Sequence, residues 1–191
     1  MKKYLFVLAM IAALSLALSG CEVTISGNGP NGPVGVTNPS SGPSGTAHFG
    51  RQTKTSGCAA HGGLPDSACT PGAVFPNVTL QEICRYGYTR TVRNVPFTEK
   101  DQVYAEYGIF HHSSGQYELD HLVPLEIGGN NDIANLWPEA AYPKPGFHEK
   151  DKVENYLHDQ VCSGAMPLSE AQKEIATNWL AVYNRMPPQY Q

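Results

Sequence analysis

The chain has 191 residues, of which 41% are hydrophobic and only 16% are charged, and its formal net charge is −4 at pH 7. This balance excludes a protein that binds nucleic acid mainly through a basic surface. Any phosphate binding would depend on a metal ion and on a few local cations.

The first twenty residues have the pattern of an export signal. Lys2 and Lys3 precede an apolar run over residues 5–18, and small residues follow it before Cys21. The run is short for a membrane span, and the arrangement is typical of a cleaved signal. Its ending resembles the lipobox of bacterial lipoproteins, which implies a signal peptide over residues 1–20 and acylation of Cys21. The lipid would anchor the protein to a membrane.

Residues 21–56 are predicted to form a flexible tether behind that anchor. They are rich in Gly, Pro, Ser, Asn and Thr, so they bury too little apolar surface to offset the entropy lost on ordering. The remaining residues, 57–191, have the length of one domain. Glu22 follows the lipidation site, and by the lipoprotein sorting rule the absence of Asp there favours the outer membrane of a two-membrane bacterium. The domain would face the periplasm or the exterior.

The predicted domain contains four cysteines, which indicate two disulfides. An even number of cysteines in an exported chain is typical of disulfide pairs, and four cysteines permit three pairings. We favour Cys58 with Cys69, which closes a short loop, and Cys84 with Cys162, which ties the N-terminal part of the domain to a helix. The alternative is a structural zinc site, but no close Cys-x-x-Cys pair is present and export disfavours free thiolates.

The first half of the domain gives local signals. Thr79 and Glu82 form a capping-box pattern for a short helix. Residues 88–95 alternate well enough for a strand, which would carry Arg90 and Arg93.

Two further helices are expected. Thr98 can cap a helix over residues 99–107, with Gly108 ending it. Near the C-terminus, Ser169 and Gln172 fit another capping box. The helix there has an apolar stripe that we interpret as core, formed by Leu168, Ala171, Ile175, Trp179 and Val182.

The stretch over residues 117–158 carries the pattern around which the domain is organised. A mostly apolar strand is followed by a Gly/Asn/Asp cluster, which is a strong reversal signal, and then by a second short strand. A helix is expected over residues 148–158. Asp120 and His121 are neighbours in the first strand, so their side chains point to opposite faces unless the backbone bulges there.

This succession resembles the HNH nuclease family, whose core is two strands and a helix around one divalent metal. The resemblance implies an α+β fold with a ββα-metal core, additional helices and the two disulfides. It implies that Asp120 is a metal ligand and that His121 is the general base. Asn135 matches the family's central Asn, whose amide would tie the loop between the strands and hold His121 in place.

The metal ligand on the helix stays open between three residues. His148, Asp151 and Asn155 are three and four residues apart and therefore share a helical face. His148 is the first choice, Asn155 the second and Asp151 the third. The oxygen ligand Asp120 favours Mg²⁺ or Mn²⁺, whereas a His148 ligand would also admit Zn²⁺ or Ni²⁺.

Other polar residues are assigned by their place around this stretch. Arg90, Arg93 and Lys152 are the candidates for contact with substrate phosphate. His158 stays open between a functional role and a place on the helix surface or in a buried hydrogen bond. The remaining histidines fit no part of the pattern and are expected on the surface: His61, His111 and His112.

The sequence therefore predicts an exported, membrane-anchored, metal-dependent endonuclease that hydrolyses DNA. Histidine suits the general base because its ordinary pKa lies near neutrality, and the metal would stabilise charge on the phosphate. No groove-reading helix or zinc finger is evident, so low sequence specificity is expected. One alternative is a nuclease that also acts on RNA, and another is a non-catalytic surface lipoprotein that uses the fold for binding. No protein partner is inferred.

Overall fold

The computed structural model describes residues 49–191. The predictions for the signal segment, for Cys21 and for residues 22–48 of the tether lie outside the described residues. Within the described part, no helix is long and apolar enough to cross a membrane. The described chain is a mixed α+β fold, as expected, with one small sheet, several helices and two disulfides.

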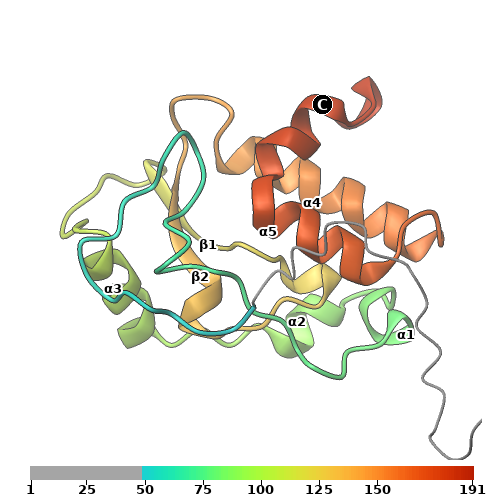
Figure 1. Cartoon of the computed structure of the whole chain (residues 1–191), viewed down its shortest axis with the longest axis horizontal. Helices are drawn as coiled ribbons and strands as arrows, with labels where there is room; N and C mark the ends of the chain where they lie inside the picture. Colours follow the sequence, from blue (N-terminus) through green and yellow to red (C-terminus); the bar gives the residue numbers. More distant parts are fainter. Residues whose placement is uncertain (1–48) are drawn as a thin grey trace, which may run out of the picture. The chain divides into compact units, whose positions relative to one another are not determined.

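The sheet consists of two antiparallel strands, β1 (Tyr117–His121) and β2 (Leu136–Ala140), which lie together in Figure 1. Asp120 pairs with Trp137, and His121 pairs with Leu136. Because side chains alternate along a strand, Asp120 and His121 point to opposite faces of the sheet.

The connection between the strands is compact and contains two single-turn 3₁₀ helices, η1 (Leu125–Ile127) and η2 (Ile133–Asn135). A glycine is required where it turns, because a Cβ atom on Gly129 would stand 1.8 Å from the carbonyl oxygen of Val123.

Two long helices supply most of the core. α4 (Phe147–Cys162) and α5 (Leu168–Arg185) pack side by side. The predicted apolar stripe of α5 is confirmed, because four of its five residues are buried and Leu168 packs against them. Burial of one large apolar side chain contributes about 1.5–3 kcal/mol. The stripe meets three buried residues of α4: Val153, Leu157 and Val161.

The start of α5 differs from the prediction. Pro167 is the residue before its first turn, and no side chain caps the helix. Gln172 is instead buried, and its Nε2 donates to the carbonyl oxygen of Ile127 at 2.8 Å. The expected capping box of Ser169 and Gln172 is therefore wrong, because a contact with η1 takes the Gln172 side chain.

Three short helices precede the sheet. The capping box of Thr79 and Glu82 is confirmed at the start of α1 (Leu80–Ile83). The strand predicted over residues 88–95 is wrong, because α2 (Tyr88–Val92) forms there. Tyr88 and Val92 are four residues apart, and on a helix both reach the same core. Alternation over so few residues did not distinguish the two structures.

The helix α3 (Phe97–Glu106) begins two residues earlier than expected. Pro96 precedes its first turn, so Thr98 is not the cap. Val103 and Glu106 are its buried residues. Gly108 follows the helix with a φ of +69°, a left-handed conformation that favours glycine.

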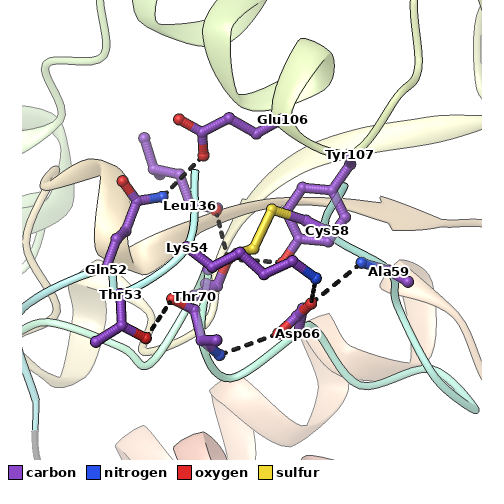
Figure 2. The surroundings of a disulfide bond; sticks show 12 residues. Gln52, Thr53, Lys54, Cys58, Ala59, Asp66, Thr70, Glu106, Tyr107 and Leu136 are labelled. Atoms are coloured by element: carbon purple, nitrogen blue, oxygen red, sulfur yellow. Dashed lines mark hydrogen bonds and ion pairs between the residues drawn. A yellow bond between two sulfur atoms is a disulfide. The ribbon is translucent and has the colours of Figure 1, made fainter. Parts of the chain in front are cut away.

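Residues 49–78, here called the N-terminal loop segment, contain no helix or regular strand. Its first residues nevertheless belong to the fold. The Gly50 amide donates to Gly72 at 2.8 Å, and the Thr53 amide donates to Ala68 at 2.8 Å. Gln52 also donates to the Glu106 carboxylate of α3 at 2.8 Å, as Figure 2 shows. Contacts with the domain thus begin before residue 57, within the stretch assigned to the tether.

Both disulfides have the pairing favoured from the sequence, Cys58 with Cys69 and Cys84 with Cys162. The first is buried inside the N-terminal loop segment, close to Tyr107 at the end of α3 (Figure 2). Beside it, Thr70 Oγ1 donates to the carbonyl oxygen of Leu136 at 3.0 Å. The N-terminal loop segment is thus bonded directly to the start of β2.

A short loop over residues 141–146 joins β2 to α4. Tyr142 is 73% exposed and precedes Pro143, and Lys144 precedes Pro145. Glu149 fixes the start of the helix, since its carboxylate accepts from the Gly146 amide at 2.9 Å and from Lys144 Nζ at 2.9 Å. The helix expected over residues 148–158 is therefore present, with longer bounds.

Candidate active site

Asp120 forms an ion pair with a lysine that is completely buried. Lys150 Nζ, from the first turns of α4, lies 2.6 Å from Asp120 Oδ2 and 2.9 Å from the carbonyl oxygen of His121, and it also pairs with Glu154. Burial alone would lower the pKa of Lys150, but the carboxylates of Asp120 and Glu154 outweigh it and raise that pKa. Burial would raise the pKa of Asp120, yet Lys150 holds it below its ordinary value. Both groups are charged.

Glu139 of β2 lies on the same face of the sheet as Asp120. It is 1% exposed, and its carboxylate oxygens have no donor partner within residues 49–191, but the protonated group can donate to the Asp120 carboxylate. Burial raises its pKa well above the carboxyl range, and the negative charge of Asp120 adds to the rise even though Lys150 opposes it. Glu139 is therefore neutral at pH 7, which avoids an unpaired buried charge.

Sequence reasoning missed this buried group of Lys150, Glu139 and Glu154. One signal was available, because Lys150 and Glu154 are spaced four residues apart as helical ion pairs are. Nothing in the sequence showed that this pair turns inward. Lysine is almost never fully buried unless it is paired, so a position on the surface was the ordinary expectation.

His121 faces the opposite side of the sheet in a nearly closed environment. His121 is 3% exposed, and its Nε2 is 3.3 Å from Asn131 Oδ1. The Asn131 amide nitrogen donates to the carbonyl oxygen of Val92 at 2.7 Å, which leaves Oδ1 to accept from His121. We assign the imidazole hydrogen to Nε2 on this basis, so that Nδ1 is the free acceptor. Burial lowers the pKa of His121 to about 4, so the imidazole is neutral.

Asn135 ties together the segments that surround His121. Its Oδ1 accepts from the amides of Val123 at 2.9 Å and Ala73 at 3.2 Å. Its Nδ2 donates to the carbonyl oxygens of Val123 and Asn130, each at 2.9 Å. The side chain is fully buried. This is the structural tie that the sequence predicted for the amide.

The three candidate ligands on α4 differ in their relation to Asp120. Burial raises the pKa of Asp151, the negative charge of Asp120 raises it further, and His148 lowers it. His148 is exposed and packs on Phe147 with ring centroids 4.2 Å apart. Asn155 is exposed, and its amide donates to the Asp151 carbonyl oxygen at 2.7 Å.

Carboxylate oxygens are the donors that a hard divalent cation prefers, but Asp120, His148 and Asp151 do not bring three donor atoms within 4.8 Å of one another in the described chain. Asp120 Oδ1 accepts from the His121 amide at 2.7 Å and Oδ2 binds Lys150, but each carboxylate oxygen has a second lone pair. A cation beside Asp120 would also relieve the charge repulsion that raises the pKa of Asp151. The Asn155 amide nitrogen bonds to its own helix, which leaves Oδ1 as the atom of that side chain that could bind a cation.

One of the three predicted phosphate contacts lies near the site. The positive charge of Arg93 helps to lower the pKa of His121 and opposes the rise in the pKa of Glu118. Arg90 and Lys152 form no ion pair within the part of the chain that the structure describes. The remaining predicted surface histidines are exposed: His61, His111 and His112.

Comparison with protein-family models, with curated proteins and with solved structures finds no match to this chain. The geometry of its own residues therefore carries the functional argument.

Proposed function

We propose that this chain is a metal-dependent endonuclease of the HNH type that hydrolyses DNA with low sequence specificity. The observation that carries the proposal is the pair at the end of β1. His121 is neutral and held by Asn131, while Asp120 is charged and faces the start of α4. A neutral imidazole can accept a proton, and a carboxylate can bind a cation. On one strand these two groups point to opposite faces.

His121 would accept the proton of the attacking water. Its hydrogen on Nε2 is directed to Asn131 Oδ1, so the lone pair on Nδ1 is available as the base. Its lowered pKa keeps the imidazole unprotonated over the physiological pH range. Arg93 would contribute positive charge near the substrate phosphate.

Asp120, with Asp151 or His148, would hold the divalent cation, which we propose to be Mg²⁺ or Mn²⁺, with Zn²⁺ or Ni²⁺ admitted if His148 binds. Such an ion stabilises negative charge on a phosphate and on a departing oxygen. Lys150 would keep Asp120 oriented, because its ammonium also binds the His121 carbonyl oxygen on the adjacent backbone.

We also propose that the protein is exported and lipid-anchored through Cys21. Both disulfides are typical of an oxidising compartment and support export. The substrate would then be DNA in the periplasm or outside the cell.

Cleavage of plasmid DNA and of RNA, with and without a chelator, tests the proposal. We expect metal-dependent cleavage of plasmid, and parallel cleavage of RNA would extend the substrate to both nucleic acids. His121→Ala should lower the rate by about 10²- to 10⁴-fold, because a general base is lost, while metal binding measured by calorimetry persists.

Asp120→Asn should instead weaken metal affinity and activity together, with partial recovery at high metal concentration. His111→Ala, in an exposed histidine away from β1, is the matched control and should keep full activity. Full activity in both the His121 and the Asp120 variants would remove the nuclease assignment.

One observation favours the non-catalytic alternative, a surface lipoprotein that binds nucleic acid without cutting it. Both carboxylate oxygens of Asp120 already have partners, which reduces their capacity for a metal. Under that alternative the protein would bind DNA in a mobility-shift assay, would leave it intact at every metal concentration, and would show no heat of metal binding dependent on Asp120.

A further inference from the structure

The Cys84–Cys162 disulfide has a third metal-ligating side chain beside it. Cys84 ends α1, while His158 and Cys162 lie one turn apart in α4. His158 Nε2 is 3.4 Å from Cys162 Sγ, and the donor atoms of the three residues all lie within 4.8 Å of one another. In residues 49–191, no other three His, Cys or carboxylate groups converge in this way.

The dimensions of this cluster are close to those of a tetrahedral zinc site. Zinc binds sulfur at about 2.3 Å and nitrogen at about 2.0–2.1 Å, so the sulfur and nitrogen ligands stand about 3.6 Å apart. The observed distance between Cys162 Sγ and His158 Nε2 is 3.4 Å. The two sulfur atoms must separate to about 3.8 Å once the bond between them is broken, and Cys84 Sγ already lies within 4.8 Å of the ligating nitrogen of His158.

We propose that reduction of the Cys84–Cys162 disulfide converts this cluster into a Cys₂His site for a zinc-class divalent cation. A dithiol reductant supplies the two electrons and two protons and itself becomes a disulfide. Each new thiol then gives its proton to solvent as it binds the cation, so two protons are released per ion. Water can occupy the fourth position.

His158 must change its tautomer to serve as the nitrogen ligand. In the disulfide-bonded protein its Nε2 lies 3.2 Å from the Ile83 carbonyl oxygen, to which an Nε2 hydrogen would donate. When Nε2 binds the cation, the hydrogen moves to Nδ1. Asp159 Oδ1 is 4.0 Å from Nδ1, so a small rotation lets this carboxylate accept that hydrogen and orient the ring.

The cation would hold the same two elements that the disulfide joins, α1 and α4. The chain therefore has two chemically distinct ways to make one connection, a metal bridge in the reduced state and a covalent bond in the oxidised state. This inference is independent of the proposed nuclease activity, because Cys84, His158 and Cys162 take no part in the site at Asp120 and His121.

Cobalt titration of the full chain tests the inference. All proteins carry Cys21→Ala so that the fifth cysteine adds no thiolate, and each is reduced with a phosphine and desalted without oxygen. We expect one sulfur-bound Co²⁺ per reduced chain, seen as a sulfur-to-cobalt charge-transfer band, in addition to any ion held at Asp120. Zn²⁺ should displace the sulfur-bound ion. The oxidised protein should show no such band.

Three variants locate the ligands. His158→Gln should lower Co²⁺ affinity by at least about tenfold, and His111→Gln, in an exposed histidine outside both proposed metal sites, should leave it unchanged. The double variant Cys58→Ala with Cys69→Ala should keep the band, because these two cysteines are not part of the Cys84, His158 and Cys162 cluster.

The inference is overturned if His158→Gln binds Co²⁺ as tightly as the parent. It is also overturned if the band survives in Cys84→Ser with Cys162→Ser, or never appears in reduced protein. Circular dichroism measures whether the reduced protein keeps its helices. If the helices are lost on reduction and do not return when Zn²⁺ is added, the protein has no such site and the inference is overturned.

Discussion

The two disulfides stabilise regions that are held together in different ways. Cys58–Cys69 is buried in the N-terminal loop segment, which has no helix or regular strand and is held by hydrogen bonds, one ion pair and a few apolar side chains that pack against the core. Cys84–Cys162 joins α1 to the end of α4, beside an apolar core that α4 and α5 build without it. The first bond defines a local conformation, whereas the second connects elements that already pack. Loss of each bond should therefore be detected in a different measurement.

Chain entropy gives the opposite order for overall stability. A cross-link stabilises mainly by restricting the unfolded chain, and the restriction grows with the length of the closed loop. The sequence separation is 11 residues for Cys58–Cys69 and 78 for Cys84–Cys162. The bond that matters less to local structure should contribute more to the free energy of unfolding.

The largest effect is expected when the long-range bond is removed. Cys84→Ala with Cys162→Ala should lower the free energy of unfolding by about 4.5 kcal/mol, the chain-entropy value for a loop of that length. The folded state should keep its far-ultraviolet circular dichroism. The amides of α4 and α5 should keep the rank that they have among the helices in protection against hydrogen exchange. Urea denaturation gives the free energy of unfolding. A variant that lost protection in α5 before global unfolding would contradict the comparison.

A smaller global effect with a larger local one is expected for the buried bond. Cys58→Ala with Cys69→Ala should cost about 3 kcal/mol. Hydrogen exchange should quicken first at the amides of Gly50 and Thr53, which bond across this segment to the carbonyl oxygens of Gly72 and Ala68. Equal protection of these two amides in both double variants would show that hydrogen bonds alone fix the N-terminal loop segment.

Removal of residues 49–56 takes away several polar contacts and the packing of Phe49 on the core without touching either disulfide. A chain that begins at residue 57 loses the bonds of Gly50, Gln52 and Thr53 to the domain. At about 0.5–1.5 kcal/mol for each bond, less the entropy regained, we expect a loss of about 2 kcal/mol relative to a chain that begins at residue 49. Thermal denaturation of the two chains gives the difference. Identical midpoints of thermal denaturation would show that residues 49–56 do not stabilise the domain, which would then begin at residue 57.

The smallest effect concerns Asp66, which accepts hydrogen bonds from Lys54 Nζ at 2.8 Å and from the Ala68 amide at 3.0 Å. The bond from Lys54, despite an opposing effect of burial, lowers the pKa of Asp66. A carboxylate with a depressed pKa stabilises the fold above its unfolded pKa of about 3.9, and this stabilisation is lost as pH falls through the folded value.

Asp66→Asn should therefore cost less than about 1 kcal/mol at pH 7, because the Lys54 pair is largely exposed to solvent. The difference between variant and parent should shrink below about pH 4. Urea titrations at pH 7 and pH 3 provide the measurement. A difference that grew on acidification would mean that Asp66 is protonated more readily when folded.

Elements with a long or specific sequence pattern were predictable. The stripe of α5 spans several turns, so its period identifies a helix and its buried face. Thr79 and Glu82 marked a helix start through a bond that is local in the chain. The disulfide pairing followed from loop length and from the expected position of a helix. In each case the residues that form the contact also carry the signal.

Features that depend on distant contacts were not predictable. Four or five residues around Tyr88 fit either a strand or a helix, and packing against the core decides between them. Phe49 looked like part of a tether because its neighbours are polar, yet its ring packs against the core. The buried environment of Lys150 depends on Asp120, thirty residues earlier, so composition alone describes it as a surface cation. The assignment of Asp120 and His121 to metal and proton chemistry stays a prediction.

The loop between β2 and α4 has a consequence for resistance to proteolysis. Its exposed Tyr142 and its Lys144 are side chains that secreted proteases recognise, but each is followed by proline. Proline has no amide hydrogen and a fixed φ angle, which serine proteases do not accept after the bond they cut. Limited digestion with trypsin or chymotrypsin should therefore spare this loop. The strand that carries Glu139 and the helix that carries Lys150 would remain one covalent unit in a proteolytic environment.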